Sequence, residues 1–413
     1  MNNNQKRIST KFFVYKILTN LWFLGAVWLY FYRIYINDAQ IGILDSVAFT
    51  IGLIAEVPSG VLADRFGRDK MVRLGQFLAG SGLIIQGFGH SLTQFIFGQA
   101  VMMIGVSFVS GADEALFFDQ LKFKKESPLW RKLITRGSQI ALIGTTTATI
   151  LGGWIYGIDP RIPWIISGIS LIGSVGVIWS IKDTRVKKGG QRVFDELKEQ
   201  LISIKTGFAE FFTTKLFLYI PIIITVQGVF YAAGWGLLKL VLMNRFYFDP
   251  FAGSIVIAAC SLITVAVLGY MHKHAENLSE KKVLTLISFL ATASLLLSVA
   301  NIGWWGFLVI LTLHAGEYVL VPFMSEVVNY RTGENQRATV LSVASFLRTL
   351  PYVALAPIIG SLNTQNKLEY FLVFWAILIV SAVVIYLVFK KKDVKISLIK
   401  EKVVEGRVPE IKT

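Results

Sequence analysis

Long apolar stretches, separated by short polar ones, recur along nearly the whole chain of 413 residues. A helix needs about 20 mainly apolar residues to cross the hydrocarbon core of a bilayer. Twelve stretches meet this length, and they cover residues 12–36, 41–63, 71–90, 92–118, 137–158, 162–182, 216–243, 251–271, 282–301, 304–328, 337–361 and 368–390. The pattern predicts an all-α integral membrane protein with about twelve transmembrane helices.

The order of these segments predicts two halves. Six segments lie in residues 1–182 and six in residues 216–390, and a charged cytoplasmic linker of residues 183–215 separates them. Within the linker, apolar residues recur at helical spacing and predict an amphipathic helix on the membrane surface: Val193, Phe194, Leu197, Leu201, Ile204 and Phe208. Two sets of six spans are typical of transporters built from two pseudo-symmetric six-helix bundles. Residues 391–413 are expected to form a cytoplasmic tail.

Composition and charge support a membrane setting. Hydrophobic residues make up 54% of the chain and charged residues only 16%, whereas a water-soluble domain carries about 25% charged residues. The net charge is +15, and 34 of the 41 Lys and Arg residues lie at the N-terminus, in alternate loops or in the tail. By the positive-inside rule this distribution predicts a cell-membrane protein with both termini in the cytoplasm. It explains the charge through topology, and no nucleic-acid partner is expected.

One motif carries a family resemblance. Residues 60–70, at the inner end of the second span, read Gly-Val-Leu-Ala-Asp-Arg-Phe-Gly-Arg-Asp-Lys. They resemble the signature G-x-L-A-D-[RK]-x-G-[RK]-[RK] of the major facilitator superfamily, and only Asp69 departs from it. The resemblance implies a transporter that works by alternating access, with a gating latch on the cytoplasmic side. The latch residues it implies are Gly60, Asp64, Arg65, Gly67 and Arg68, with Asp119 as a partner for the arginines.

A weaker resemblance lies in the fifth span. Gly144, Gly152 and Gly153 have the spacing of the exporters' motif G-x-x-x-G-P-x-x-G-G, but Ala148 and Thr149 replace its middle glycine and its proline. Small residues at these places favour close helix packing, and Thr hydroxyls can satisfy freed carbonyls. Over nearly its whole length the chain is similar to a bacterial group described as drug exporters.

Ionisable residues inside membrane helices are costly, and each is therefore a candidate for function. In the first half these are Glu56, Asp113 and Glu114. Glu56 shares a helical face with Gly60 and Asp64, and it is either a structural partner or a proton carrier. Asp113 and Glu114 either form a proton site or pair with the basic inner loops.

In the second half, His314 and Glu317 share a helical face and are candidates for a hydrogen-bonded proton site. Arg348 lies midway along the eleventh span and should either pair with a carboxylate such as Glu317 or bind an anionic substrate group. Gln227, Tyr231 and Trp235 follow one face of the seventh span, and they either line a substrate pocket or pack between helices.

These residues predict a monomeric secondary transporter rather than an enzyme, because no nucleotide-binding loop, nucleophile motif or credible metal-ligand set is present. No cofactor or metal is expected. The favoured function is export of amphipathic, drug-like small molecules in antiport with protons. The alternative is uptake or facilitated transport of a polar nutrient, and a membrane-embedded enzyme is a remote third.

Overall fold

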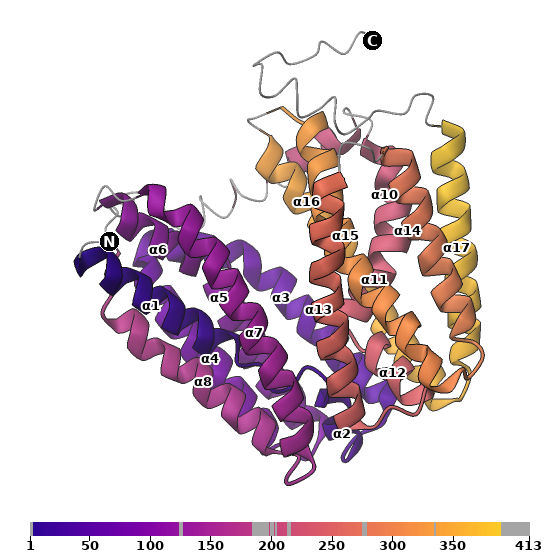
Figure 1. The fold of residues 1–413 in the computed structure, drawn as a ribbon, viewed down its shortest axis with the longest axis horizontal. Coiled ribbons are helices and arrows are strands. Elements are labelled where there is room, and N and C mark those ends of the chain that lie inside the picture. The colour runs from indigo at the N-terminus through magenta and orange to yellow at the C-terminus, as the bar shows by residue number, and fades with distance from the viewer. Residues whose placement is uncertain are drawn as a thin grey trace. The chain divides into compact units, whose positions relative to one another are not determined.

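The computed structural model describes residues 3–123, 127–183, 205–212, 216–274, 279–333 and 336–389, together with Lys198 and Ile202. Every regular element of this part of the chain is a helix, which confirms the predicted all-α class (Figure 1). The tail of residues 391–413 and most of the predicted linker helix lie outside the described residues, although residues 205–212 are helical. The linker and tail boundaries therefore stay predictions.

Contacts divide the chain into two compact units. Unit 1 consists of Met1–Ile202 and Phe248–Ala258, and unit 2 of Ser203–Tyr247 and Ala259–Thr413. The helices of unit 1 are α1 (Asn3–Asn20), α2 (Trp28–Arg33), α3 (Asp38–Phe66), α4 (Arg68–Gly87), α5 (Leu92–Val109), α6 (Ala112–Phe123), α7 (Trp130–Tyr156) and α8 (Ile162–Trp179), with the 3₁₀ turn η1 (Ser127–Leu129) before α7.

Unit 2 begins with a segmented helix made of η2 (Leu216–Tyr219), α10 (Ile220–Ile222), the π-helix η3 (Ile223–Gln227), α11 (Gly228–Gly234) and α12 (Leu238–Arg245). The helix α13 (Pro250–His274) starts in unit 1 and continues into unit 2. The remaining elements are α14 (Glu280–Leu297), the 3₁₀ turn η5 (Gly303–Trp305), α15 (Gly306–Arg331), α16 (Arg337–Thr364) and α17 (Leu368–Phe389).

Eight segments of the described chain are long and apolar enough to cross a membrane. They correspond to the second, fourth, sixth, seventh, eighth, tenth, eleventh and twelfth predicted spans. The third, fifth and ninth predicted spans are the continuous helices α4, α7 and α14, of 20, 27 and 18 residues. Two of them begin with clusters of charge, Arg68-Asp69-Lys70 in α4 and Glu280-Lys281-Lys282 in α14, which lowers their mean hydropathy.

Glycines let the helices of unit 1 approach closely around α4. A Cβ atom on Gly75 would lie 2.6 Å from the carbonyl oxygen of Gly105 on α5. A Cβ on Gly168 of α8 would lie 2.6 Å from the carbonyl oxygen of Gly80. Close backbone approach at small residues is the usual packing of membrane helices, where the hydrophobic effect does not hold helices together. α4 thus packs closely against both α5 and α8.

Two spans of unit 1 that the sequence predicts as continuous are interrupted. The first span is broken between α1 and α2, and the fourth between α5 and α6, where Gly111 has a φ of 70°. Side chains from neighbouring helices satisfy the backbone groups freed at the first break. Thr145 Oγ1 donates to Asn20 O at 3.0 Å, Ser170 Oγ donates to Leu18 O at 2.7 Å, and Phe23 N donates to Ser167 Oγ at 3.1 Å.

The seventh predicted span, the first of the second set of six, is broken in the same manner. Leu237 N donates to the hydroxyl of Tyr352 on α16 at 2.7 Å, and Trp375 Nε1 of α17 donates to Thr225 O at 2.9 Å. Lys239 Nζ donates to Gly234 O, the last residue of α11, at 3.1 Å. The first span of each set of six is therefore discontinuous, and each is completed by side chains of the fifth and sixth spans of its own set. This relationship supports the predicted pseudo-symmetry of the two halves.

Candidate functional site

The residues of the predicted latch lie between α3 and α4. Gly67 has a φ of 101°, a conformation that favours glycine, and it is the single residue between the two helices. Arg68 opens α4, and its guanidinium NH1 donates to Asp119 Oδ2 on α6 at 2.7 Å. Its backbone N donates to Asp183 Oδ2, beyond the end of α8, at 2.8 Å. The pairing of Arg68 with Asp119 is confirmed, whereas the Asp183 contact was not expected.

Asp69, the one departure from the family signature, has a local partner. Arg73 lies one turn later on α4, and its NH2 donates to Asp69 Oδ2 at 2.8 Å. The Arg73 guanidinium also lies over the ring of Trp179 at the end of α8, 5.1 Å from its centroid. Where the family signature has a second basic residue, this chain thus has an aspartate that forms an ion pair within α4.

The other latch residues lie on the surface of unit 1. Gly60 and Arg65 are exposed, and Asp64 is half-buried. Glu56, one turn before Gly60, is exposed as well, although it belongs to an apolar span. Glu56, Gly60 and Asp64 therefore lie along one accessible face of α3, as their helical spacing predicted.

The two adjacent carboxylates of the fourth span both contact α1. Asp113 Oδ2 accepts from the hydroxyl of the fully buried Tyr15 at 3.2 Å, and Tyr15 in turn accepts from Gln76 Nε2 at 2.8 Å. Glu114 pairs with Lys16 Nζ at 2.7 Å. In the part of the chain that the structure describes, neither of these contacts is with a basic inner loop, because Lys16 lies within a predicted span.

The glycines of the fifth span differ in their packing. A Cβ on Gly152 would overlap the backbone of Phe23, and a Cβ on Gly153 would lie 2.6 Å from Cβ of Ser254 at the start of α13. Gly144 is less constrained, since the atom nearest to a Cβ added there would be Asn20 O, at 3.8 Å. Close packing is thus a property of the second half of this motif.

Unit 2 contains a buried ion pair near its broken span. Arg348 NH1 of α16 donates to Glu317 Oε1 of α15 at 3.0 Å. Glu317 is only 3% exposed, and its second oxygen, Oε2, is buried and makes no hydrogen bond within the described residues. The Arg348 guanidinium lies over the ring of Tyr231 at 5.2 Å from the centroid. Of the two alternatives for Arg348, the structure shows the pairing with a carboxylate, Glu317.

The predicted partner of Glu317 on its own helix has a different contact. His314 is buried, but its Nε2 lies 3.3 Å from Ser261 Oγ on α13, and its ring is 5.1 Å from that of Tyr318. The structure shows no hydrogen bond between His314 and Glu317 within the described residues. A shared helical face brought these two residues to the same side without bringing their polar atoms together.

The predicted aromatic face of the seventh span is split by burial. Gln227 and Tyr231 are buried, whereas Trp235 is 60% exposed and follows Gly234 at the break. A Cβ on Gly234 would lie 3.0 Å from Cγ of Glu317, so the break lies directly against the ion pair. Tyr231 and Tyr352 lie with their rings 6.0 Å apart. The broken helix thus places aromatic rings and a buried carboxylate together.

Sequence reasoning missed a second buried cluster in unit 2. Glu280, at the start of α14, is 2% exposed. Its carboxylate accepts hydrogen bonds from the hydroxyls of Tyr219 and Tyr386 and forms an ion pair with Arg331 NH2 at 2.9 Å. The Arg331 guanidinium also lies over the Tyr219 ring at 5.0 Å. Only the position of Glu280 directly after the helix-capping Ser279 could have suggested an ordered carboxylate.

Comparison with known proteins decides the family. The sequence model described as Major Facilitator Superfamily matches residues 12–354. The chain belongs to this superfamily. Multidrug resistance protein 2 of Bacillus subtilis (strain 168) is 23% identical over 352 residues, which cover 84% of this chain and 85% of that protein. This relative agrees with the resemblance to the drug-exporter-like group.

Solved structures of the superfamily share the fold. The nucleoside transporter NupG matches with a TM-score of 0.70 at 11% identity, over 95% of this chain and all of NupG (100%). The peptide transporter POT in complex with sulfate matches with a TM-score of 0.65 at 12% identity, over 92% of this chain and 93% of that one. A D-xylose-proton symporter matches with a TM-score of 0.64 at 11% identity, over 92% of this chain and 97% of the symporter chain. The chain is therefore a multi-pass membrane transporter of the major facilitator fold.

Proposed function

We propose that this transporter exports amphipathic, drug-like small molecules across the cell membrane in exchange for protons. The single observation that carries the proposal is the state of Glu317. Its carboxylate is buried in a membrane helix, one oxygen is held by Arg348, and the other has no hydrogen bond within the described residues. A buried carboxylate is costly unless it pairs or takes up a proton. Glu317 therefore has one position where a proton can bind.

The ion pair supplies the coupling step. When Glu317 is deprotonated, its charge is balanced by Arg348. When Glu317 takes up a proton, the attraction to Arg348 is lost, and the guanidinium can move toward other partners. A cationic substrate group would compete with Arg348 and with the proton for the same carboxylate. Competition for one site is what an exchanger needs, because proton and substrate are then carried in opposite steps.

The aromatic rings beside this carboxylate suit an amphipathic substrate. Tyr231, Tyr352 and Trp235 lie around the break in the seventh span, next to Glu317. Aromatic faces provide apolar contact area and attract cations. Discontinuous helices lining a central site are a recurring feature of secondary transporters. The substrate class is thus supported by the same elements that position the carboxylate.

We propose that unit 1 contributes gating and a second set of proton carriers. Arg68, Asp119 and Asp183 join the ends of three predicted spans, and Gly60, Asp64 and Arg65 remain accessible on the surface of the same unit. Asp113 and Glu114, in contact with Tyr15 and Lys16, and the exposed Glu56 are the candidate proton carriers. In this proposal the protein acts as a monomer, with both termini in the cytoplasm.

One observation favours a second function, uptake of a polar nutrient that carries an anionic group. Arg348 Nε is buried and makes no hydrogen bond within the described residues, so the guanidinium retains a donor for a carboxylate or phosphate. In that case Arg348 binds the substrate, and Glu317 only positions the Arg348 guanidinium. The two functions differ in substrate charge and are therefore separable.

The test uses the purified full chain in liposomes that hold a pH-sensitive dye. Lipophilic cations are offered with and without an imposed proton gradient. Proton movement that depends on the cation and is lost in Glu317→Gln supports exchange. The matched control is Glu369→Gln, which removes a carboxylate at the start of α17 and should retain exchange. Uptake of anionic solutes without any response to cations, abolished by Arg348→Gln, would establish the second function instead.

A further inference from the structure

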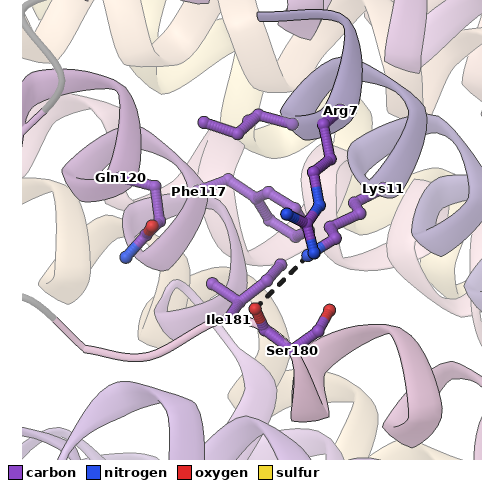
Figure 2. Close-up of a pocket in the computed structure, with 7 residues that line it drawn as sticks. Arg7, Lys11, Phe117, Gln120, Ser180 and Ile181 are labelled. Atoms are coloured by element: carbon purple, nitrogen blue, oxygen red, sulfur yellow. Dashed lines mark hydrogen bonds between the residues drawn. The ribbon is translucent and has the colours of Figure 1, made fainter. Parts of the chain in front are cut away.

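A small basic pocket lies in unit 1, and none of the residues that line it has a transport role above. It has a volume of about 150 Å³ and is lined by residues of α1, α6 and the segment after α8. The lining residues are Arg7, Ile8, Lys11, Phe117, Gln120, Ser180 and Ile181. Figure 2 shows the side chains of Arg7 and Lys11 extending from α1 in the same direction, toward Ser180.

The size of this pocket excludes a drug-sized substrate. Sites for such ligands enclose about 300–1,000 Å³, at least twice the volume found here. A single phosphate group with its first substituents is of the right order. The pocket is therefore suited to a small polar group of a larger molecule that lies mostly outside it.

The polar atoms of the pocket favour an anion that also carries hydroxyls. Arg7 makes no hydrogen bond or ion pair within the described residues, so its planar fork of donors is available for two oxygens of a phosphate. Lys11 Nζ donates to Ser180 O at 3.3 Å. This contact places a second cation in the pocket, on the same helix as Arg7. Ser180 O is in turn an acceptor for a hydroxyl. No carboxylate is among the lining residues.

The location matches the boundary between hydrocarbon and water. Ser180 and Ile181 directly follow α8, a predicted span, and Gln120 lies in the last turn of α6. Trp179 and Phe123, at the ends of the same two helices, are each 70% exposed. Exposed tryptophans at helix ends typically lie at the headgroup level of a bilayer. The apolar side chains of Ile8, Phe117 and Ile181 line the remaining wall.

We propose that this pocket binds the phosphate of an anionic phospholipid whose headgroup carries hydroxyls, such as phosphatidylglycerol. Arg7 and Lys11 bind the phosphate oxygens, and Ser180 O accepts from a headgroup hydroxyl. Ile8, Phe117 and Ile181 form the apolar inner wall behind the phosphate, and the acyl chains lie outside the pocket. Basic pockets between membrane helices bind lipid phosphates by this combination of charge and apolar contact. A free phosphate ion would use the cations but not the apolar wall.

The experiment is native mass spectrometry of the full chain, released from micelles that contain phosphatidylglycerol, phosphatidylcholine or inorganic phosphate alone. The variant is Arg7→Gln with Lys11→Gln. Its matched control is Lys205→Gln with Lys282→Gln, which removes two exposed cations of unit 2. Size-exclusion profiles of all variants establish that each is folded. We expect a phosphatidylglycerol adduct in the native protein and the control, and about tenfold or more weaker retention in the pocket variant.

Three outcomes would overturn the proposal. If both double variants lose phosphatidylglycerol equally, the lipid is held by diffuse positive charge and not by this pocket. If inorganic phosphate is retained with the same dependence on Arg7 and Lys11 while phosphatidylglycerol is not, the ligand is a free anion. Retention of phosphatidylcholine as strongly as phosphatidylglycerol would contradict the role assigned to the net charge of the lipid.

Discussion

Arg331, at the end of α15, donates to Glu280, at the start of α14, at 2.9 Å. In unit 1, Arg68 at the start of α4 donates to Asp119 near the end of α6 at 2.7 Å. α4 and α14 are the third spans of their sets of six, and α6 and α15 are in the fourth spans. The two units thus join equivalent helix ends with an ion pair, but the positions of the cation and the anion are exchanged.

Replacing Glu280 should destabilise unit 2 strongly. In Glu280→Gln, the half-buried Arg331 loses its counter-charge, and the hydroxyls of Tyr219 and Tyr386 lose an ionised acceptor. Breaking one side of a buried ion pair typically costs about 3–5 kcal/mol. We expect a loss of this order in the free energy of unfolding, measured by denaturation in mixed micelles. Glu369→Gln is the matched control and should change it by less than about 0.5 kcal/mol.

Exchanging the two charges tests the relationship between the units. Unit 1 shows that a cation at the start of the third span and an anion at the end of the fourth can pair. The double variant Glu280→Arg with Arg331→Glu should therefore recover a large part of the stability that either single variant loses. Additive losses in the double variant would show that the ion pair does not tolerate exchange and that the resemblance between the units is only topological.

The sequence predicted those contacts that a general physical constraint requires. An arginine in the middle of an apolar span must find an anion, and this argument named Glu317 as one of two alternatives for Arg348, beside an anionic substrate group. The latch pairing of Arg68 with Asp119 followed from a motif. In both cases the identity of at least one residue already limited the choice of partner.

Contacts that depend on which helices are neighbours were not predictable in this way. Lys16 and Glu114 are 98 positions apart, and pairing them requires knowing that α1 lies beside α6. The breaks in the first and seventh spans were missed for a related reason. Glycines lie at both breaks, Gly25 in the first and Gly236 in the seventh, but a single glycine is tolerated within a membrane helix and does not by itself predict a break. A hydroxyl from another helix, Thr145 or Tyr352, stabilises each break.

The ion pair of Glu317 and Arg348 should show strong coupling in a double-mutant cycle. Arg348→Gln leaves the buried Glu317 without its counter-charge, so we expect a loss of about 3–5 kcal/mol in the free energy of unfolding. The double variant Glu317→Gln with Arg348→Gln removes both charges and should be within about 1 kcal/mol of the native protein. Transport should stay abolished in the double variant, because no group is left to carry the proton.

The measurements are denaturation in micelles for stability and the liposome assay for transport, both on the same preparations. Lys367→Gln, an exposed cation between α16 and α17, is the control for charge removal. Restored transport in the double variant would contradict the coupling role of Glu317 while leaving the ion pair itself intact. Equal stability of Arg348→Gln and the native protein would contradict the buried pair.

The hydroxyl of Tyr352 should hold the break in the seventh span. It accepts the backbone N–H of Leu237 at 2.7 Å, a group that the interrupted helix leaves free. Tyr352→Phe removes this acceptor and retains the ring, so we expect a loss of about 0.5–2 kcal/mol in the free energy of unfolding. Hydrogen exchange of the Leu237 amide should become faster. Tyr370→Phe, in which the altered side chain is 66% exposed, should leave both quantities unchanged.

Two glycines of the fifth span should respond oppositely to the same change. In Gly152→Ala the new methyl group would overlap the backbone of Phe23, which cannot move without disturbing the bonds that complete the first span. Overpacking of this kind costs about 1–3 kcal/mol. In Gly144→Ala the nearest atom, Asn20 O, would be 3.8 Å away, and alanine favours the helix by up to about 1 kcal/mol. Thermal denaturation should therefore rank Gly144→Ala at or above the native protein and Gly152→Ala below it. Equal destabilisation by both changes would mean that the whole motif, and not its second half, is closely packed.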